Sequence, residues 1–419
     1  MTLAAASTGA GAASAATTAP TATTTSASTA TSKAPTAADV GLATRGPATG
    51  TPIRIGLVNT EGTPGLDFPE LRINITVSAE YLNRHGGMGG RPIVLVNCTA
   101  KGSPETSQAC AQDVVGKKVE MVLLGLDLFP DYATYSAANV PVIGVLPILP
   151  GDYTAKALFL TGGNATLMAA IAAVAKNHFK ARNVSIIGAD NPGANSSEAS
   201  LTASLDLAGL AHVTVKGGDN ETDAGFQGLM RQATKNKPDL IVSLYSDAGC
   251  IGTIRARASL RIATPVVTTG ICAGRNVLKA VGDDATGWTF SGVQTPAESP
   301  SGAILRDIMA PVLKVPAADV DSSTLGIGAL GIFEIMSLAQ YAGVIEAAGS
   351  PVTGAALYDF VKSAPNLILW GSGAKIQCGA APKYPTICSF TFPFAMYASG
   401  GAVATIAGLE AVSSLEFLP

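Results

Sequence analysis

The sequence predicts an α/β protein with two Rossmann-like lobes in series, each built on a parallel central sheet. Three observations predict this class. Residues 53–98 run as strand, loop, helix and strand, the alternation continues to about residue 143, and a second alternation starts beyond residue 158. Alternating strands and helices of this kind are typical of doubly wound parallel sheets.

The first unit shows the pattern most clearly. Residues 53–58 are a nearly all-apolar run, as expected of a parallel strand buried on both faces. Residues 59–67 are rich in turn formers, and residues 69–84 then carry apolar side chains at helical spacing. A GGMGG run ends this helix before a second strand at 92–96. Ligands bind at the carboxyl ends of strands in open parallel sheets, so the widened first loop is a candidate ligand site.

The remaining elements repeat this alternation. The first lobe continues with helices at 104–118 and 131–138 and strands at 121–124 and 140–143. The second lobe has helices at 165–179, 196–207, 224–236 and 248–260, and strands at 184–189, 212–215, 240–244 and 265–268. A further strand at 288–293, two helices within 301–348 and a terminal hairpin turning at Gly400 and Gly401 must pack on these sheets.

Composition bounds the class of protein. With 47% hydrophobic and 14% charged residues, the 419-residue chain can bury real cores. Residues 1–50 are the exception, because they consist almost entirely of Ala, Thr, Ser, Gly and Pro. We expect a disordered tether there, since so little apolar surface cannot offset the entropy of ordering it. This segment lacks the basic and apolar regions of a signal peptide.

Six cysteines form three sequence-local pairs: Cys98 with Cys110, Cys250 with Cys272, and Cys378 with Cys388. None has the spacing of a zinc site and the three histidines lie far apart, so we expect no metal. The pairing favours disulfides, although the sequence permits other connectivities and six buried free thiols are the alternative. Disulfides persist in oxidising compartments, which predicts an extracytoplasmic protein.

Several function classes find no support in the residues. A net charge of −3 without a basic run argues against nucleic acid as a partner. The most apolar stretch, 325–348, carries Glu334, Gln340 and Glu346, which favours a soluble core helix over a membrane span. No motif places a nucleophile beside a general base, so we expect neither an enzyme nor a cofactor.

Four segments carry a family resemblance: IRIGLVNTEG, EYLNRHGGMGGRPIVLVNC, PDLIVSLYSDAGCIGTIRARASLRIATPVVTTG and LKAVGDDATGWTFSG. In their order and context they resemble type I periplasmic binding proteins, the branched-chain amino acid and amide receptor group, over about residues 52–415. The resemblance implies two α/β lobes joined by three crossover segments, here near 160–163, 290–295 and 386–393. It also implies a monomer that binds a small-molecule ligand by hinge closure and presents it to the membrane subunits of an ABC transporter.

The resemblance also implies domain boundaries. We expect residues 1–50 to be the tether, residues 51–161 plus 294–386 to form lobe 1, and residues 162–293 plus 387–419 to form lobe 2. A lipidated cysteine upstream of the tether would attach such a protein to the membrane. A sensing domain of a receptor or regulator is the alternative, because the same fold can bias a signalling equilibrium instead of delivering its ligand.

Binding positions transfer residue by residue. The family's hydroxyl residue after the third strand corresponds to the loop containing Leu126 and the acid Asp127, and its small residues after the fourth strand correspond to Leu146, Pro147, Ile148 and Leu149. Its tyrosine in the second lobe corresponds to Tyr245. Its ammonium-binding acid aligns with Ile271 or Cys272, so that acid is missing. The resemblance therefore implies a ligand other than a standard α-amino acid.

Loop positions complete the predicted site. Glu61 and Phe68 follow the first strand, and Tyr245, Ser246 and Asp247 occupy the equivalent place in the second lobe. Each could equally be an ordinary loop residue. We expect Glu61, Asp127 and Tyr245 to be polar anchors and residues 146–149 to form an apolar wall. An acid-lined pocket of this kind favours amines or neutral apolar compounds.

Overall fold

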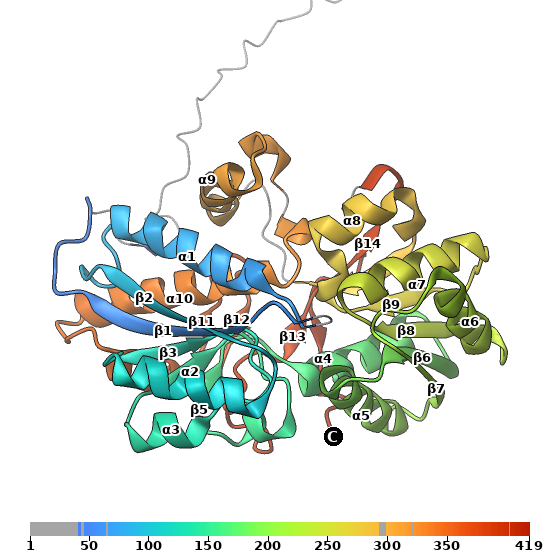
Figure 1. Cartoon of the computed structure of the whole chain (residues 1–419), viewed down its shortest axis with the longest axis horizontal. Coiled ribbons are helices and arrows are strands. Elements are labelled where there is room, and N and C mark those ends of the chain that lie inside the picture. The colour runs from blue at the N-terminus through green and yellow to red at the C-terminus, as the bar shows by residue number, and fades with distance from the viewer. Residues whose placement is uncertain (1–40, 43–45, 64–65, 293–298, 321, 402) are drawn as a thin grey trace, which may run out of the picture. The chain divides into compact units, whose positions relative to one another are not determined.

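The computed structural model describes residues 41–42, 46–63, 66–292, 299–320, 322–401 and 403–419. Most of the predicted tether therefore lies outside the described residues. Two sheets organise the rest of the chain, and both belong to the single unit Pro35–Pro419 (Figure 1).

The first sheet has five parallel strands in the order β2-β1-β3-β4-β5. β1 runs parallel to β2 from the Ile53–Ile93 pair to the Thr60–Ala100 pair. Its inner strands are apolar on both faces, and all four residues of β3 are buried. The bounds are β1 Ile53–Thr60, β2 Ile93–Ala100, β3 Met121–Leu124, β4 Val142–Gly144 and β5 Ala157–Phe159.

Helices from two distant parts of the chain cover this first sheet. One face carries α2 Pro104–Gly116 and α3 Tyr132–Ala137. The other face carries α1 Pro69–Arg84 together with α9 Pro300–Leu313, α10 Gly328–Ala347 and α11 Gly354–Ser363. A short ribbon, β11 Leu367–Ile368 with β12 Lys375–Ile376, brings Trp370 into the same cluster.

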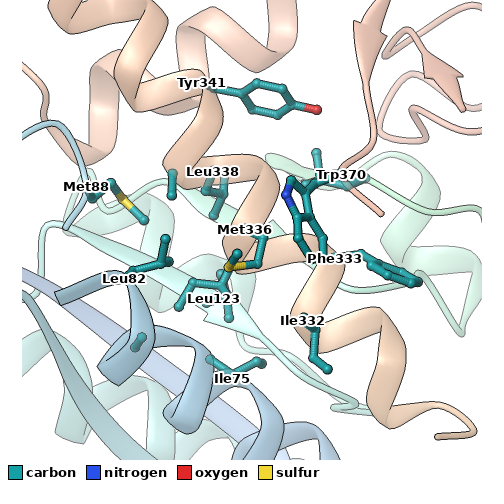
Figure 2. Close-up of a cluster of buried hydrophobic side chains, with 14 of the residues drawn as sticks. Ile75, Leu82, Met88, Leu123, Ile332, Phe333, Met336, Leu338, Tyr341 and Trp370 are labelled. Atoms are coloured by element: carbon teal, nitrogen blue, oxygen red, sulfur yellow. The ribbon is translucent and has the colours of Figure 1, made fainter. Parts of the chain in front are cut away.

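Figure 2 shows this cluster, with Ile75 and Leu82 of α1 gathered with Ile332 and Met336 of α10. Helix α10 is long and apolar enough to cross a membrane by length and composition, but 78% of its most apolar window is buried inside the protein. That burial is typical of the core helix of a globular domain. α9 and α10 are the two helices expected within 301–348.

The second sheet has seven strands in the order β15-β14-β10-β9-β8-β6-β7. Five are parallel to one another, while β14 and β15 are an antiparallel pair at one edge. This pair is the predicted terminal hairpin. The bounds are β6 Asn183–Ala189, β7 Ala211–Gly217, β8 Leu240–Leu244, β9 Val266–Thr268, β10 Trp288–Ser291, β14 Phe394–Tyr397 and β15 Val403–Thr405.

Two layers of helices cover the second sheet. One face packs against α4 Asn164–Ala173 and α5 Pro192–Leu207. The other packs against α6 Asp223–Thr234, α7 Asp247–Ser259 and α8 Arg275–Val281. α4 continues into a π-helical turn, Val174–His178, and β13 Thr391–Phe392 pairs with β16 Val412–Ser413.

The segments that pass between the sheets lie close together. Phe159 forms a parallel bridge with Ile387, and Gly292 N donates to Pro393 O at 3.1 Å. Gly163 is required by the first crossover, because a Cβ there would lie 1.7 Å from Pro147 O. Residues 293–298 of the second crossover lie outside the described residues. We propose the lobe boundaries at residues 162, 294 and 387.

All six cysteines are paired as the sequence suggests. Cys98–Cys110 joins β2 to α2, Cys250–Cys272 joins α7 to the turn after β9, and Cys378–Cys388 closes the loop after β12. Their sequence separations are 12, 22 and 10 residues. In the chain-entropy account each such bridge stabilises the fold by about 3 kcal/mol.

Candidate functional site

A cavity of about 160 Å³ lies between the two sheets, where the parallel strands of both end. From the first sheet it receives the loops after β1, β3 and β4 and the start of α10. From the second it receives the loops after β6, β8, β9 and β10 and the start of α4. The lining residues are Leu66, Phe68, Leu126, Leu128, Leu146, Ile148, Thr161, Gly162, Gly163, Asn164, Leu167, Asn191, Gly193, Ala194, Ser197, Leu244, Tyr245, Ser246, Thr269, Gly270, Ile271, Ser291, Gly292, Gly326, Ile327, Leu330 and Phe392.

Five helices begin at the lining of this cavity. Their N-cap residues are Phe68 for α1, Gly163 for α4, Asn191 for α5, Ser246 for α7 and Ile327 for α10. The first N–H groups of a helix lack partners within the helix, and the helix dipole places a partial positive charge there. Such ends favour anions and hydrogen-bond acceptors.

The wall of the cavity is mostly apolar. Leu126 and Leu128 come from the loop after β3, and Leu146 and Ile148 from the loop after β4. They pack in one cluster with Phe68 of the first loop. This wall would exclude water from a bound ligand and stabilise it through burial of its apolar surface.

The polar side chains of the lining are uncharged, and two of them, Asn164 and Asn191, already form hydrogen bonds with other groups. Ser197 Oγ donates to Asn164 Oδ1 at 2.9 Å. Asn191 accepts from Ala194 N at 2.9 Å and donates to Asp219 Oδ1 at 2.7 Å. Where side chains are described, no Lys, Arg, His, Asp or Glu lines the cavity, and no cluster of His, Cys, Asp and Glu could hold a metal ion.

Four of the residues predicted from the sequence lie at this cavity: Phe68, Leu126, Tyr245 and Ser246. Tyr245 is 2% exposed and packs edge-on against Phe226 with ring centroids 5.6 Å apart. Its hydroxyl lies beside Gly217 at the end of β7, where a Cβ would come within 2.8 Å of it. Burial and the nearby Glu221 and Asp219 raise the pKa of Tyr245, so it stays neutral.

Glu61 does not line the cavity, contrary to its predicted role as an anchor. Arg72 binds its carboxylate with two hydrogen bonds, Nε to Oε1 at 2.7 Å and the second nitrogen to Oε2 at 2.9 Å. Asn59 donates to the same Oε1 at 3.1 Å. Burial raises the pKa of Glu61, but the hydrogen bonds from Arg72 and Asn59 outweigh it and lower the pKa overall. The carboxylate is therefore committed to an ion pair inside the first lobe.

Asp127 also lies outside the lining, which corrects the expectation of an acid-lined pocket. Ser107 of α2 donates to Asp127 Oδ1 at 2.6 Å, and Phe129 N donates to it at 3.2 Å. Ser107 is fully buried in the first lobe, so the Asp127 side chain faces the interior of the lobe while Leu126 and Leu128 on either side of it line the cavity.

Pro147, Cys272 and Asp247 complete the comparison with the predicted site. Pro147 lies between the lining residues 146 and 148 and does not line the cavity, although its carbonyl accepts from Asn164 N at 3.2 Å. Cys272 is buried in its disulfide, and its neighbour Ile271 lines the cavity instead. Asp247 begins α7, but its side chain lies outside the described part of the chain.

Sequence reasoning missed the start of α5, which brings Asn191, Gly193 and Ser197 to the cavity. One signal was available, because Asn191 followed by Pro192 is the pattern of a helix N-cap and first position after an apolar strand. Phe392 and Ile327 carried no such signal. Each comes from a part of the chain beyond Cys272, the last residue of the predicted site.

Comparisons with known proteins identify the family to which the chain is similar. The family "periplasmic binding protein" matches residues 52–381. An ABC transporter substrate-binding protein from Sphaerobacter thermophilus has a similar structure, with a TM-score of 0.68, 18% identity, and coverage of 88% of this chain and 99% of that chain. None of the curated proteins compared matches the sequence.

Two further solved structures have a similar fold. A solute-binding protein of an ABC transporter from R. palustris, in complex with benzoate, has a TM-score of 0.67 at 14% identity, covering 86% of this chain and 96% of that chain. A leucine-binding protein from Thermotoga maritima has a TM-score of 0.65 at 15% identity, covering 86% and 99%. These are solute-binding proteins, not enzymes, and the family implies an extracytoplasmic location. With its two-lobed α/β fold and a match over most of its length, this chain belongs to the periplasmic binding protein family.

Proposed function

We propose that the chain is the extracytoplasmic solute-binding component of an ABC importer. The observation that carries the proposal is the cavity itself, which both sheets line at the carboxyl ends of their strands. A ligand held there contacts both lobes at once. Binding can therefore change how the lobes are arranged, and a transporter's membrane subunits can distinguish the loaded protein from the empty one.

The lining supports a ligand with an apolar body and one carboxylate or other hydrogen-bond acceptor. The apolar wall favours the body, and the five helix N-termini favour the acceptor. The lining offers no described carboxylate to balance an ammonium group, so amines and α-amino acids fit it less well. The similar solved structures of R. palustris proteins in complex with benzoate and 4-hydroxybenzoate lead us to propose aromatic carboxylates as the first class to test.

A thermal-shift screen of the full chain tests this ligand class. The probes are benzoate and 4-hydroxybenzoate, the neutral benzamide, the cationic benzylamine, and leucine. A ligand at about 100 times its dissociation constant stabilises the folded state by about 2.7 kcal/mol. We expect stabilisation by the two carboxylates and none by benzylamine. Stabilisation by leucine alone would contradict the ligand class and leave solute binding intact.

A variant that introduces a negative charge tests whether the ligand binds in this cavity. Ile271 is half-buried and lines the cavity, so Ile271→Glu would put a carboxylate beside the ligand. We expect the variant to lose the response to benzoate and to gain one to benzylamine, because the sign of the favoured ligand charge is inverted. The control is Ile73→Glu, a position on α1 that is 38% exposed and outside the lining. Equal effects of both variants would place the ligand elsewhere.

We also propose that the lobes close over the ligand. Two contacts between segments packed on different sheets border the cavity. Ser196 Oγ and Asn164 Nδ2 both donate to Ile148 O at 2.8 Å. On another side of the cavity, Gly274 forms an isolated antiparallel bridge with Leu325. These contacts would form on closure and would break when the lobes separate.

Transport is tested by reconstitution. Proteoliposomes containing the cognate ABC permease should take up the screened ligand only when this protein and ATP are supplied on the correct sides. Ligand binding without any stimulation of uptake or ATP hydrolysis would favour the sensing role instead, since both roles use the same cavity.

A further inference from the structure

Three neighbouring segments at the amino ends of β6, β8 and β9 carry a concentration of positive charge. Each consists of the end of a helix and the loop after it. They cover residues 176–182, 231–239 and 255–261, and together hold nine of the chain's 27 Lys and Arg residues. Asp239 is their one acid. The chain as a whole has a net charge of −3, so this charge is segregated from the rest of the molecule.

The sheet topology brings these loops together. They lead into β6, β8 and β9, which are adjacent and parallel in the order β9-β8-β6. Adjacent strands lie about 4.8 Å apart, so the loops share one edge of the sheet. Backbone hydrogen bonds link them directly: Asp239 N donates to Asn183 O, and Ile241 N donates to Pro265 O. The ligand cavity lies at the opposite, carboxyl ends of the same strands.

We call six exposed side chains on these loops the basic edge: Lys176, Lys180, Arg182, Lys235, Lys237 and Arg261. In the part of the chain that the structure describes, none of the six forms an ion pair. Acids also lie at this end of the sheet. Asp239 accepts from the backbone N of Arg182 and Asn183 at 2.8 and 3.0 Å and interacts with the Arg182 charge, Glu416 accepts from Asn177 at 3.0 Å, and the segment before β10 carries Asp283 and Asp284.

Three residues of the basic edge also occupy a backbone conformation that glycine adopts more easily. Lys180, Lys237 and Arg261 have φ of 53°, 49° and 51°, each just after a helix. A cation at a helix C-terminus is favoured by the helix dipole. The same feature at Lys118 and Lys314 of the other helical layers shows that this conformation is not special to the edge. What distinguishes the basic edge is that three such cations stand on adjacent loops with three more beside them.

We propose that the basic edge is a docking surface for an anionic phospholipid membrane. Clusters of Lys and Arg at the end of a domain are attracted to anionic lipid headgroups over about one Debye length. The extracytoplasmic location and proposed transport role place the protein beside a membrane. A nucleic acid is the less favoured polyanion, because residues 176–182, 231–239 and 255–261 include no exposed Phe, Tyr or Trp on which bases could stack, and their one aromatic residue of these types, Phe179, is half-buried. Docking by this end would leave the ligand cavity away from the contact.

Vesicle sedimentation tests the proposal with the full chain. Wild-type protein should bind vesicles containing phosphatidylglycerol at low ionic strength and should not bind pure phosphatidylcholine vesicles. Raising the salt to about 0.5 M should abolish binding, because screening shortens the reach of the charges. Absence of any preference for the anionic vesicles would overturn the proposal. So would retention on heparin without vesicle binding, which would indicate a soluble polyanion.

The left-handed conformation offers a variant that removes charge without damaging the fold. The triple variant Lys180→Gly, Lys237→Gly and Arg261→Gly deletes three cations where glycine is sterically preferred. We expect its partitioning to anionic vesicles to fall on the order of 100-fold, with an unchanged or higher melting temperature. The control, Lys118→Gly with Lys314→Gly, removes two left-handed cations elsewhere and should bind as the wild type does. The same loss of binding per cation removed in both variants would show that only net charge matters and would contradict a docking edge.

Discussion

At the scale of single residues, two buried carboxylates differ in how well their negative charge is balanced. Glu61 is balanced by Arg72, so its charge stabilises the first lobe. Asp127 has Ser107 as a partner for Oδ1, but its Oδ2 is buried without one among the described residues. Burial raises the pKa of Asp127, against the lowering effect of the Ser107 hydrogen bond. The ionised Asp127 side chain therefore lowers the stability of the folded state at neutral pH.

The substitution Asp127→Asn should stabilise the protein at pH 7 by about 1 kcal/mol, because it removes a poorly compensated buried charge. An acid whose folded pKa is raised contributes stability that is fully present below its unfolded pKa, near 3.8, and is lost as the pH rises through the folded value. The advantage of the variant should therefore shrink on acidification. Urea unfolding at several pH values measures it, with Asp319→Asn on the surface as the control. An advantage that is constant with pH would contradict this account.

At the scale of elements, α10 stabilises the first lobe through its buried apolar side chains and destabilises it through one buried acid. Its 20 residues are apolar on nearly every side, and 14 of them are buried between α1, α11 and the sheet. Gly331 lets it approach α1, since a Cβ there would lie 2.8 Å from Ile75 Cγ1. Glu334 is the exception, with 0% exposure and neither carboxylate oxygen hydrogen-bonded to any residue that the structure describes. Burial raises its pKa well above the usual range, which favours the neutral acid.

Replacing this acid, as Glu334→Met, should raise the free energy of unfolding at pH 7 by about 2 kcal/mol, because a flexible apolar side chain fills the site without a desolvated polar group. Glu334→Gln keeps the shape of the side chain and still buries a polar amide, so its free energy of unfolding should rise less. Chemical denaturation monitored by tryptophan fluorescence measures both, since Trp370 lies in the same cluster. A loss of stability in Glu334→Met would mean that an unrecognised partner holds the carboxyl group.

At the scale of the whole described unit, the proposed closure would depend on a close backbone contact at a glycine. Gly326 precedes α10 and has a φ of 57°. A Cβ on Gly326 would lie 3.0 Å from Gly274 Cα, so any side chain would push apart the two segments that border the cavity. Both segments contribute to the lining, through Gly326 itself, Ile327 and Ile271. The spacing between the two segments can therefore set ligand affinity in addition to any direct contact with the ligand.

The pair Gly326→Asn and Gly349→Asn tests this dependence. Both positions have positive φ, which Asn tolerates better than other residues, but nothing lies within 4 Å of a Cβ on Gly349. Gly326→Asn should weaken benzoate binding at least ~10-fold by lowering the population of the closed state. It should also speed hydrogen exchange in residues 270–275 and 322–327 without ligand. Gly349→Asn should leave affinity and exchange unchanged. Wild-type affinity in Gly326→Asn would exclude the contact as part of closure.

Sequence patterns were enough to predict the alternation of strands and helices, the three cysteine pairs, and the loops that meet at the cavity. Local patterns suffice for these features, because apolar runs, helical spacing and turn residues act over a few neighbouring positions. The positions of Phe68, Leu126, Tyr245 and Ser246 followed from the rule that ligands lie at the carboxyl ends of parallel strands. That rule depends only on the direction of the strands, and the alternation of strands and helices in the sequence already implies that they are parallel.

Which side chains of those loops face the cavity depends on tertiary contacts. Leu126 faces the cavity and Asp127 faces Ser107, which belongs to a helix about 20 residues earlier in the chain. Contacts between distant segments also bring Ile327 and Phe392 to the cavity. Similar contacts place the three segments of the basic edge next to one another. Burial and charge balance are properties of these assembled surroundings, so no local pattern could specify them.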